Sequence, residues 1–208
     1  MTQTDGTLTS IKGRLLRINS KTGQLVKNDN SGNGAPNGAT IRAAEYGDDV
    51  VHRTILTCTA TPITVADDAG VAQYGGVKVY DFPAGLIMTR GAIVSGVIGI
   101  TSGTIIATWS GVVALGSVVA TTGATLVSTE ATWLQSVAIG AATDGVGTID
   151  AVSVAAALTE SGARWFDGTA TAADMFLNLA IADDATHTAA EMYFTGTIKF
   201  GWENFGDN

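Results

Sequence analysis

The sequence predicts an all-β protein, with an antiparallel β-sandwich or jelly-roll/barrel-like body and an extended N-terminal arm. Thr, Ala, Gly and Val dominate the 208 residues, and long helix formers such as Glu, Lys and Gln are scarce. That composition favours strands and turns over helices. Apolar and polar residues also alternate with a period of two, and turn signals recur about every 8 to 12 residues. We therefore expect roughly eight to ten strands.

The arm is predicted over residues 1–48 and the all-β body over residues 49–208. Residues 27–40, "KNDNSGNGAPNGAT", are rich in Gly and Asn and contain no large apolar side chain. Alone, they cannot bury enough surface to offset the entropy of ordering. Residues 8–26 contain seven large aliphatic side chains, too many for a simple linker. We expect them to anchor the arm on a neighbour or on the body.

The body begins with strand-like segments. In "TILTCTAT" (54–61), Leu56, Cys58 and Ala60 alternate with threonines, which predicts that these three share one face. The run "GVKVYDF" (76–82) alternates likewise and ends at Pro83. Further strands are expected near residues 86–100, 104–109, 112–120 and 133–139. At most one short helix is expected, within residues 120–135 or 148–166.

The clearest strand pattern lies at the C-terminal end. In "EMYFTGTIKFGW" (191–202), five large apolar side chains fall on one face and five mostly polar ones on the other. The inward set is Met192, Phe194, Ile198, Phe200 and Trp202. The preceding "MFLNLAIA" (175–182) alternates in the same way, so we expect the two segments to form a hairpin across residues 183–190.

Charge is low and unevenly distributed. Charged residues make up 14% of the chain, against about 25% in typical soluble domains, which indicates that interfaces cover part of the surface. The net charge is −8, and residues 1–53 alone carry an excess of basic side chains. The body therefore repels nucleic acid, and we expect no direct nucleic-acid partner. Five basic residues of the arm are candidates for contact with an acidic neighbour, the alternative being a solvated segment: Lys12, Arg14, Arg17, Lys21 and Lys27.

No residue cluster indicates a reaction. The two histidines, His52 and His187, lie in no zinc or hydrolase motif, and no phosphate-binding glycine pattern occurs. We therefore predict no enzyme activity, no catalytic residue and no cofactor. Cys58 is the only cysteine and is interpreted as a small buried apolar residue. The most apolar stretch, residues 91–120, is interrupted every few residues by Gly, Ser or Thr, so no membrane contact is expected.

Two acidic pairs are candidates for a metal site. Asp67 and Asp68 lie in "VADDAG", and Asp183 and Asp184 lie in "IADDAT". Neither loop has the ligand spacing of a dedicated calcium site, and aspartates are common at turns because they accept hydrogen bonds from nearby backbone. We interpret both pairs as turn residues and predict no metal, with calcium as the alternative.

The four tryptophans allow two interpretations. Trp109, Trp133, Trp165 and Trp202 have apolar neighbours and few basic residues near them, which favours core or interface packing. The alternative is a platform on which sugars or nucleic-acid bases stack.

Two blocks carry a resemblance to a known class. "TVADDAGVAQYGGVKVYDFPAG" (64–85) and the C-terminal block 172–208 resemble virion structural proteins of tailed bacteriophages, most closely capsid decoration, or head cement, proteins. The features that carry the resemblance are a strand with the sequence "GGVKVYDFPAG" and, later in the chain, an expected hairpin with the sequence "LNLAIADD … GTIKFGWENFG". The match is to a general pattern and carries no residue-level binding motif.

The resemblance implies a function in the virion. Decoration proteins bind the outer surface of the capsid lattice and reinforce the shell, often as trimers whose N-terminal segments clasp neighbouring subunits. The implied partners are the major capsid protein and other copies of this chain, with which it would form a homo-oligomer. The resemblance also implies that the chain is made in the host cytoplasm. A tail or head fibre with a receptor-binding role is the alternative. A polysaccharide-degrading enzyme on a β scaffold is a third hypothesis.

Overall fold

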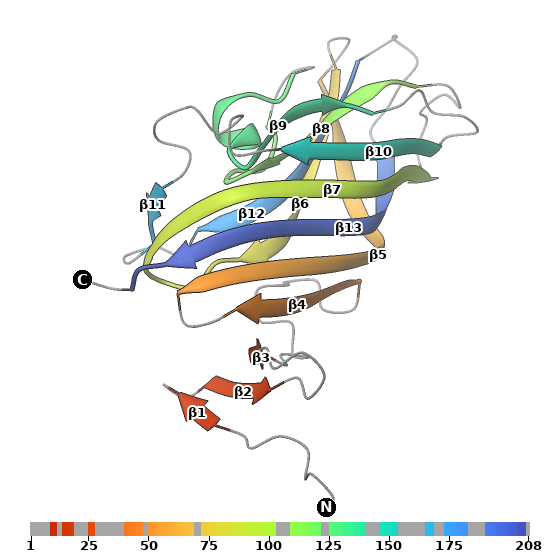
Figure 1. Ribbon diagram of the computed structural model, residues 1–208. Coiled ribbons are helices and arrows are strands. Elements are labelled where there is room, and N and C mark those ends of the chain that lie inside the picture. Colours follow the sequence, from red (N-terminus) through yellow and green to blue (C-terminus); the bar gives the residue numbers. More distant parts are fainter. Residues whose placement is uncertain are drawn as a thin grey trace, which may run out of the picture.

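Antiparallel strands dominate the computed structural model (Figure 1). The structure describes residues 9–11, 14–18, 25–27, 40–47, 50–68, 72–102, 109–121, 125–139, 146–153, 165–168, 173–182 and 190–206. One turn of 3-10 helix, η1, covers Ser128–Ala131. Within the described part of the chain, no helix has the length and apolar character needed to cross a membrane.

Within the described residues, thirteen strands pair into one sheet. They are β1 (Thr9–Ile11), β2 (Arg14–Ile18), β3 (Leu25–Lys27), β4 (Ile41–Gly47), β5 (Val51–Asp68), β6 (Ala72–Asp81), β7 (Leu86–Ser102), β8 (Gly111–Gly116), β9 (Leu134–Ala138), β10 (Val146–Ser153), β11 (Trp165–Asp167), β12 (Asp174–Ala182) and β13 (Ala190–Asn204).

The longest strands lie side by side in one half of the sheet, here called the long half. β13 pairs with β5 on one edge and with β7 on the other. β4 continues the sheet beyond β5, while β10 and β11 pair with the far edge of β7. In Figure 1 these strands form the front of the molecule.

The remaining strands form the short half, in the order β6–β12–β8–β9. The end of β5 pairs with the start of β6, from Val65 opposite Gly75 to Asp68 opposite Ala72, and this joins the two halves. The sheet curls like half of a barrel, so that the short half lies behind the long half (Figure 1). One apolar core fills the space between them, with Leu56 and Ile98 from the long half and Leu115 and Leu177 from the short half.

The all-β, antiparallel prediction is therefore confirmed. The inward face predicted for residues 191–202 is confirmed too, because its five large apolar side chains are all buried. The expected strands near 86–100, 112–120 and 133–139 correspond to β7, β8 and β9, whereas 104–109 falls largely outside the described residues.

The hairpin predicted between residues 175–182 and 191–202 is wrong. β12 pairs with β6 and β8, whereas β13 pairs with β5 and β7. The two strands are consecutive in the chain but belong to opposite halves of the sheet. The physical reason lies in the two faces of β12, where Asn178 and Ala180 are as fully buried as Leu177 and Leu179. A strand covered on both faces takes a central position in its own half.

The predicted faces of β5 are also wrong beyond Cys58. Leu56 and Cys58 are buried as expected, but Ala60 is exposed and Thr61 is completely buried. Phe194 of β13 lies opposite Thr61 and Gly196 lies opposite Cys58, so Thr59 and Ala60 together face a single residue. This β-bulge shifts the alternation by one residue. Ala60 adopts a left-handed conformation with φ 46°.

The N-terminal strands extend the sheet beyond β4. β1, β2 and β3 pair in sequence, and among the described residues β3 joins β4 through two residue pairs, Val26 with Tyr46 and Lys27 with Glu45. The division at residue 48 stays a prediction. Residues 41–47, which it assigns to the arm, pair with β5 along their whole length, and Ile41 is completely buried.

Candidate functional site

The outward face of the long half carries most of the described positive charge. We call Arg42 of β4, Arg53 of β5, Arg90 of β7 and Lys199 of β13 the basic face. Arg42, Arg53 and Arg90 are exposed, and Lys199 is half-buried. The structure describes one other basic side chain, Lys78. In a protein with a net charge of −8, this is a strong local asymmetry.

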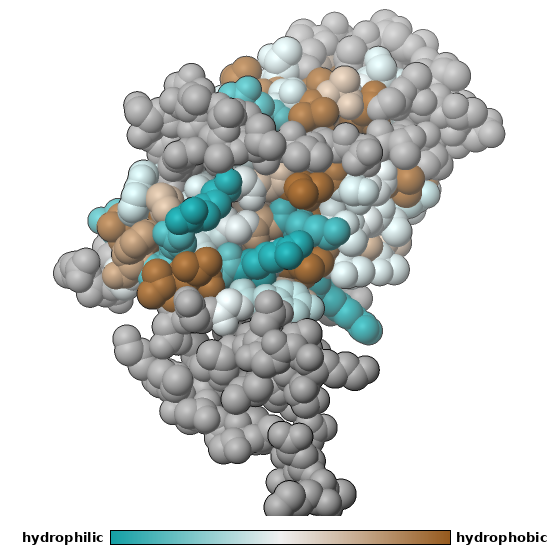
Figure 2. All heavy atoms as spheres, viewed as in Figure 1, coloured by the Kyte–Doolittle hydropathy of each residue, from teal (hydrophilic) through white to brown (hydrophobic). Residues whose placement is uncertain are grey.

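Strand register brings the basic face together. Arg42 lies opposite Thr57, which lies opposite Thr197, and two residues further along Ile55 lies opposite Lys199. Neighbouring strands are about 5 Å apart, and successive outward positions on one strand are about 7 Å apart. The Cα atoms of Arg42, Arg53 and Lys199 therefore lie within roughly 15 Å of one another. Figure 2 shows hydrophilic side chains gathered over β7, β13 and β5.

The basic side chains differ in their ion pairs. Arg90 pairs with Glu203, whose side chain is almost fully covered, and this pair fixes one end of the face. Lys78, in the short half, contacts Asp81 and lies 2.9 Å from a carboxylate oxygen of Asp174. The charge of Lys78 is therefore neutralised locally, whereas among the described residues the four positive charges of the basic face have one ion-paired carboxylate, that of Glu203.

Lys78, Asp81 and Asp174 form a charged cluster in which the pKa values of Lys78 and Asp81 are shifted. Burial lowers the pKa of Lys78, but the hydrogen bonds and charges of Asp81 and Asp174 outweigh this and hold its pKa above the ordinary value. Burial raises the pKa of Asp81, and the neighbouring Asp174 adds to the rise against the opposing effect of Lys78. Both carboxylates thus share one ammonium group across the β6–β12 pair. Among the described residues, no group of three or more His, Cys, Asp or Glu side chains is arranged to hold a metal ion.

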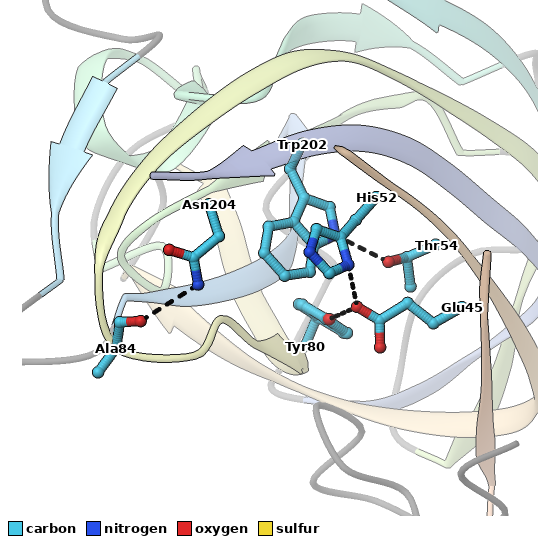
Figure 3. A network of polar contacts seen from close by, with 7 residues as sticks. All are labelled: Glu45, His52, Thr54, Tyr80, Ala84, Trp202 and Asn204. Carbon is cyan, nitrogen blue, oxygen red and sulfur yellow. Dashed lines mark hydrogen bonds and ion pairs between the residues drawn. The ribbon is translucent and has the colours of Figure 1, made fainter. Parts of the chain in front are cut away.

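A buried polar network lies on the inner side of β4 and β5 (Figure 3). The Nδ1 of His52 lies 3.1 Å from Oε1 of Glu45, and the hydroxyl of Tyr80 donates to the same oxygen at 3.4 Å. The ring of His52 stacks on Trp202, with centroids 3.9 Å apart. Trp202 in turn donates its Nε1–H to Oγ1 of Thr54 at 2.9 Å.

The network joins four strands, since Glu45 lies on β4, His52 on β5, Tyr80 on β6 and Trp202 on β13. All four side chains are buried, and a buried carboxylate is tolerated only when hydrogen bonds compensate its desolvation. The network therefore anchors β4 to the core. The other ring nitrogen of His52, Nε2, has no hydrogen-bond partner among the described residues.

A groove of about 770 Å³ opens beside η1 and β9. The thirteen described residues that line it include no acidic or basic side chain. Trp165, 46% exposed, forms part of the wall, and Trp133 is buried against Phe166 beside it. Four exposed polar side chains also line the groove: Ser128, Thr129, Gln135 and Ser136.

Asn178 holds the segment that lines this groove. Its side chain is fully buried on β12, accepts a hydrogen bond from the N–H of Ala120 at 3.0 Å, and donates to the carbonyls of Val118 and Glu130, both at 2.8 Å. Leu126 packs with Ala120 and Ala180 in a second small core over this face of β12. The wall of the groove is thus fixed by a central strand.

The structure places the sequence-predicted residues in different regions. Arg14, Arg17 and Lys27 belong to the backbones of β2 and β3, whereas Lys12 and Lys21 lie outside the described residues. Asp67 and Asp68 are the last residues of β5, where they lie opposite Gln73 and Ala72. Asp183, Asp184 and His187 lie outside the described residues. The partner-binding and calcium hypotheses for these side chains stay predictions.

Cys58 and three tryptophans are buried, as the sequence favours. Cys58 is 1% exposed, and burial raises the pKa of its thiol from 9.0 to about 11, partly opposed by a hydrogen bond with Thr61. Trp109, Trp133 and Trp202 are buried, but Trp165 is exposed and contacts the exposed ring of Phe205 at a centroid distance of 5.2 Å.

Sequence reasoning missed the basic face, the buried network and the groove. Alternation along residues 191–202 already placed Lys199 on the outward side, but strand order alone brings it beside Arg53 and Arg42. No motif marks the pairing of Glu45 with His52, because that contact depends on strand register.

The chain matches none of the known proteins with which it was compared. The comparisons found no matching protein-family model, no matching curated protein and no matching solved structure.

Proposed function

We propose that this chain is a non-enzymatic structural protein of a tailed-bacteriophage virion, which binds the outer surface of the capsid lattice and reinforces the shell. The observation that carries the proposal is the basic face, a broad and regular strand surface with positive charge on an acidic protein. Acidic protein surfaces attract such a face, and complementary charge orients the encounter. The resemblance of residues 64–85 and 172–208 to virion proteins supports the proposed location in a virion.

We propose that the body is a β-sandwich or a barrel-like fold and that an extended arm precedes it in the chain. Among the described residues, β3 and β4 share two residue pairs, and the arm is proposed to make its main contacts with another subunit. The basic arm residues Lys12, Arg14, Arg17, Lys21 and Lys27 would then clasp acidic neighbours. The partners are the major capsid protein and further copies of this chain in a homo-oligomer, a trimer being the form the resemblance implies. An arm and a body together make attachment bivalent.

The first experiment measures copy number and location. Quantitative mass spectrometry of purified particles of the phage that encodes the chain should find hundreds of copies per virion. Labelled antiserum should decorate the whole head in electron micrographs. Tens of copies confined to the tail or to fibres would favour the fibre or receptor-binding alternative, which the exposed Trp165 supports. Absence from the particles would refute the proposed function.

A charge variant tests the basic face itself. The triple variant Arg42→Gln, Arg53→Gln, Lys199→Gln removes three positive charges from exposed or half-buried positions, and we expect its occupancy on particles to fall at least tenfold. A matched control adds three negative charges at exposed positions elsewhere: Ser110→Glu, Thr125→Glu and Ser136→Glu. The control should bind like the wild type. Equal occupancy of the two variants would exclude the basic face as the binding surface.

A truncation tests the arm. The deletion should remove residues 1–39 and keep β4, because Ile41 and Glu45 are buried in the body. Circular dichroism and thermal melting should confirm that the shortened body is folded. We expect the truncated protein to occupy fewer sites and to wash off at lower salt, since salt screens exposed charges. Occupancy equal to the full chain would refute a clasping arm.

A further inference from the structure

The groove beside η1 has the composition of a sugar-binding site. Its lining combines exposed hydroxyl and amide groups, Ser128, Thr129, Gln135 and Ser136, with the exposed indole of Trp165. Small-molecule sites typically combine an apolar or aromatic wall with a few placed polar groups, and their volumes fall in the range of about 300 to 1,000 Å³. At about 770 Å³, this groove has room for a short oligosaccharide.

The described residues of the lining carry no charge, and this narrows the class of ligand. None of the thirteen described residues that line the groove is Asp, Glu, Lys or Arg. Phosphates, sulfates and carboxylates bind where basic side chains or helix N-termini supply positive charge. Residues 54–208 carry four basic and fourteen acidic side chains, so an anionic ligand would also meet a repulsive field. A neutral ligand rich in hydroxyl groups fits this surface best.

The tryptophans supply a second, independent observation. Trp165 is 46% exposed although the other three tryptophans are buried, and its ring contacts that of Phe205, with an angle of 34° between the two ring planes. Trp133, which lines the same groove, has a buried Nε1–H without a hydrogen-bond partner among the described residues. Because this N–H is itself buried, it does not face a ligand in the groove, and the exposed indole of Trp165 is the aromatic surface that the groove offers for binding.

The wall is also held in place before any ligand arrives. The hydroxyls of Ser117 and Thr132 lie 3.1 Å apart, and Thr132 donates to the carbonyl of Thr129 at 3.0 Å. Asn178 fixes the same segment through the carbonyl of Glu130. A preorganised wall lowers the entropy lost on binding.

We propose that this groove binds neutral oligosaccharides, with Trp165 stacking against a sugar ring and Gln135, Ser136 and the η1 hydroxyls recognising its hydroxyl groups. The role goes beyond shell reinforcement, because a protein on the outside of a particle that also bound host glycans would hold the particle near a cell surface. It does not depend on the basic face, which lies on the outward side of the long half.

The test is a glycan microarray that carries neutral, sialylated and sulfated glycans, probed with the full-length labelled protein. Titration of the best neutral hit by isothermal calorimetry follows. We expect binding to neutral glycans, at least a tenfold loss of affinity in Trp165→Ala, and partial retention in Trp165→Phe, which keeps an aromatic face. Ile93→Ala is the matched control, since Ile93 is 40% exposed on the basic face, and it should bind like the wild type.

Three outcomes would overturn the inference. They are no glycan binding above background, binding confined to charged glycans, and equal affinity of Trp165→Ala and the wild type. Thermal melting of Trp165→Ala checks that the variant is folded, and Gln135→Ala, at a second exposed position, provides an independent loss-of-contact variant. Glycan binding by a protein that is absent from virions would contradict the capsid proposal and leave the saccharide site standing.

Discussion

Two glycines allow the central strands of the long half to approach each other. Gly196 of β13 lies directly opposite Gly96 of β7. A Cβ placed on Gly196 would lie 2.2 Å from the carbonyl oxygen of Ser95 and 2.7 Å from the Cα of Gly96. Both atoms belong to backbone that the β7–β13 ladder holds in position. The substitution Gly196→Ala therefore forces the two strands apart or breaks local hydrogen bonds.

The cost follows from where the clash lies. Overpacking a well-filled interior typically destabilises a protein by about 1 to 3 kcal/mol, and the upper end applies because backbone, unlike a side chain, cannot rotate away. We expect the free energy of unfolding to fall by about 3 kcal/mol. With a urea m-value of about 2 kcal/mol/M, the unfolding midpoint would drop by about 1.5 M.

Urea unfolding followed by tryptophan fluorescence measures this change. Gly201→Ala is the matched control on the same strand, because a Cβ there meets its nearest atoms at 3.6 and 3.8 Å, which is ordinary contact. That variant should stay within about 1 kcal/mol of the wild type, since it mainly restricts the unfolded chain. Equal midpoints for Gly196→Ala and Gly201→Ala would refute the close approach of β7 and β13.

Three further predictions concern other parts of the fold. The folded thiol of Cys58 has a pKa raised from 9.0 to about 11, so its contribution to stability is complete below pH 9 and is lost as pH rises to 11. The free energy of unfolding, measured with urea between pH 9 and pH 11, should fall by about 3 kcal/mol because of this group. The Cys58→Ala variant should lack this part of the pH dependence. Ala60→Gly should stabilise the protein by about 1 kcal/mol because φ is 46° at Ala60, whereas Ala66→Gly, at an exposed β5 position, should destabilise it; matching signs in thermal melts would contradict the bulge. Asn178→Ala leaves three backbone groups unpaired and should cost about 3 kcal/mol, with faster amide hydrogen exchange in residues 118–130 if this side chain holds that segment.

Alternation in the sequence was sufficient to predict strand type and much of the inward face. Met192, Phe194 and Trp202 are buried as their spacing predicts, because successive side chains on a strand point to opposite faces. The same rule failed at Ala60, where one extra residue in a bulge shifts the alternation. A bulge has no distinctive composition here, so the sequence does not mark it.

Strand order could not be predicted from neighbouring segments. The pattern in residues 175–182 and 191–202 suggested a hairpin, since consecutive strands usually pair, yet β12 and β13 belong to opposite halves of the sheet. The partners were decided by burial of both faces of β12, where Asn178 and the segment around Leu126 cover the side away from the main core.

What the sequence determined by itself is therefore local: the all-β class, the strand segments, the low charge and the burial of Cys58. Only the tertiary structure brought Arg42, Arg53 and Lys199 onto one surface and placed Trp165 at the edge of the groove beside η1. The physical reason is that side-chain periodicity depends on neighbours along one strand, whereas a binding surface depends on the pairing and register of strands far apart in the chain.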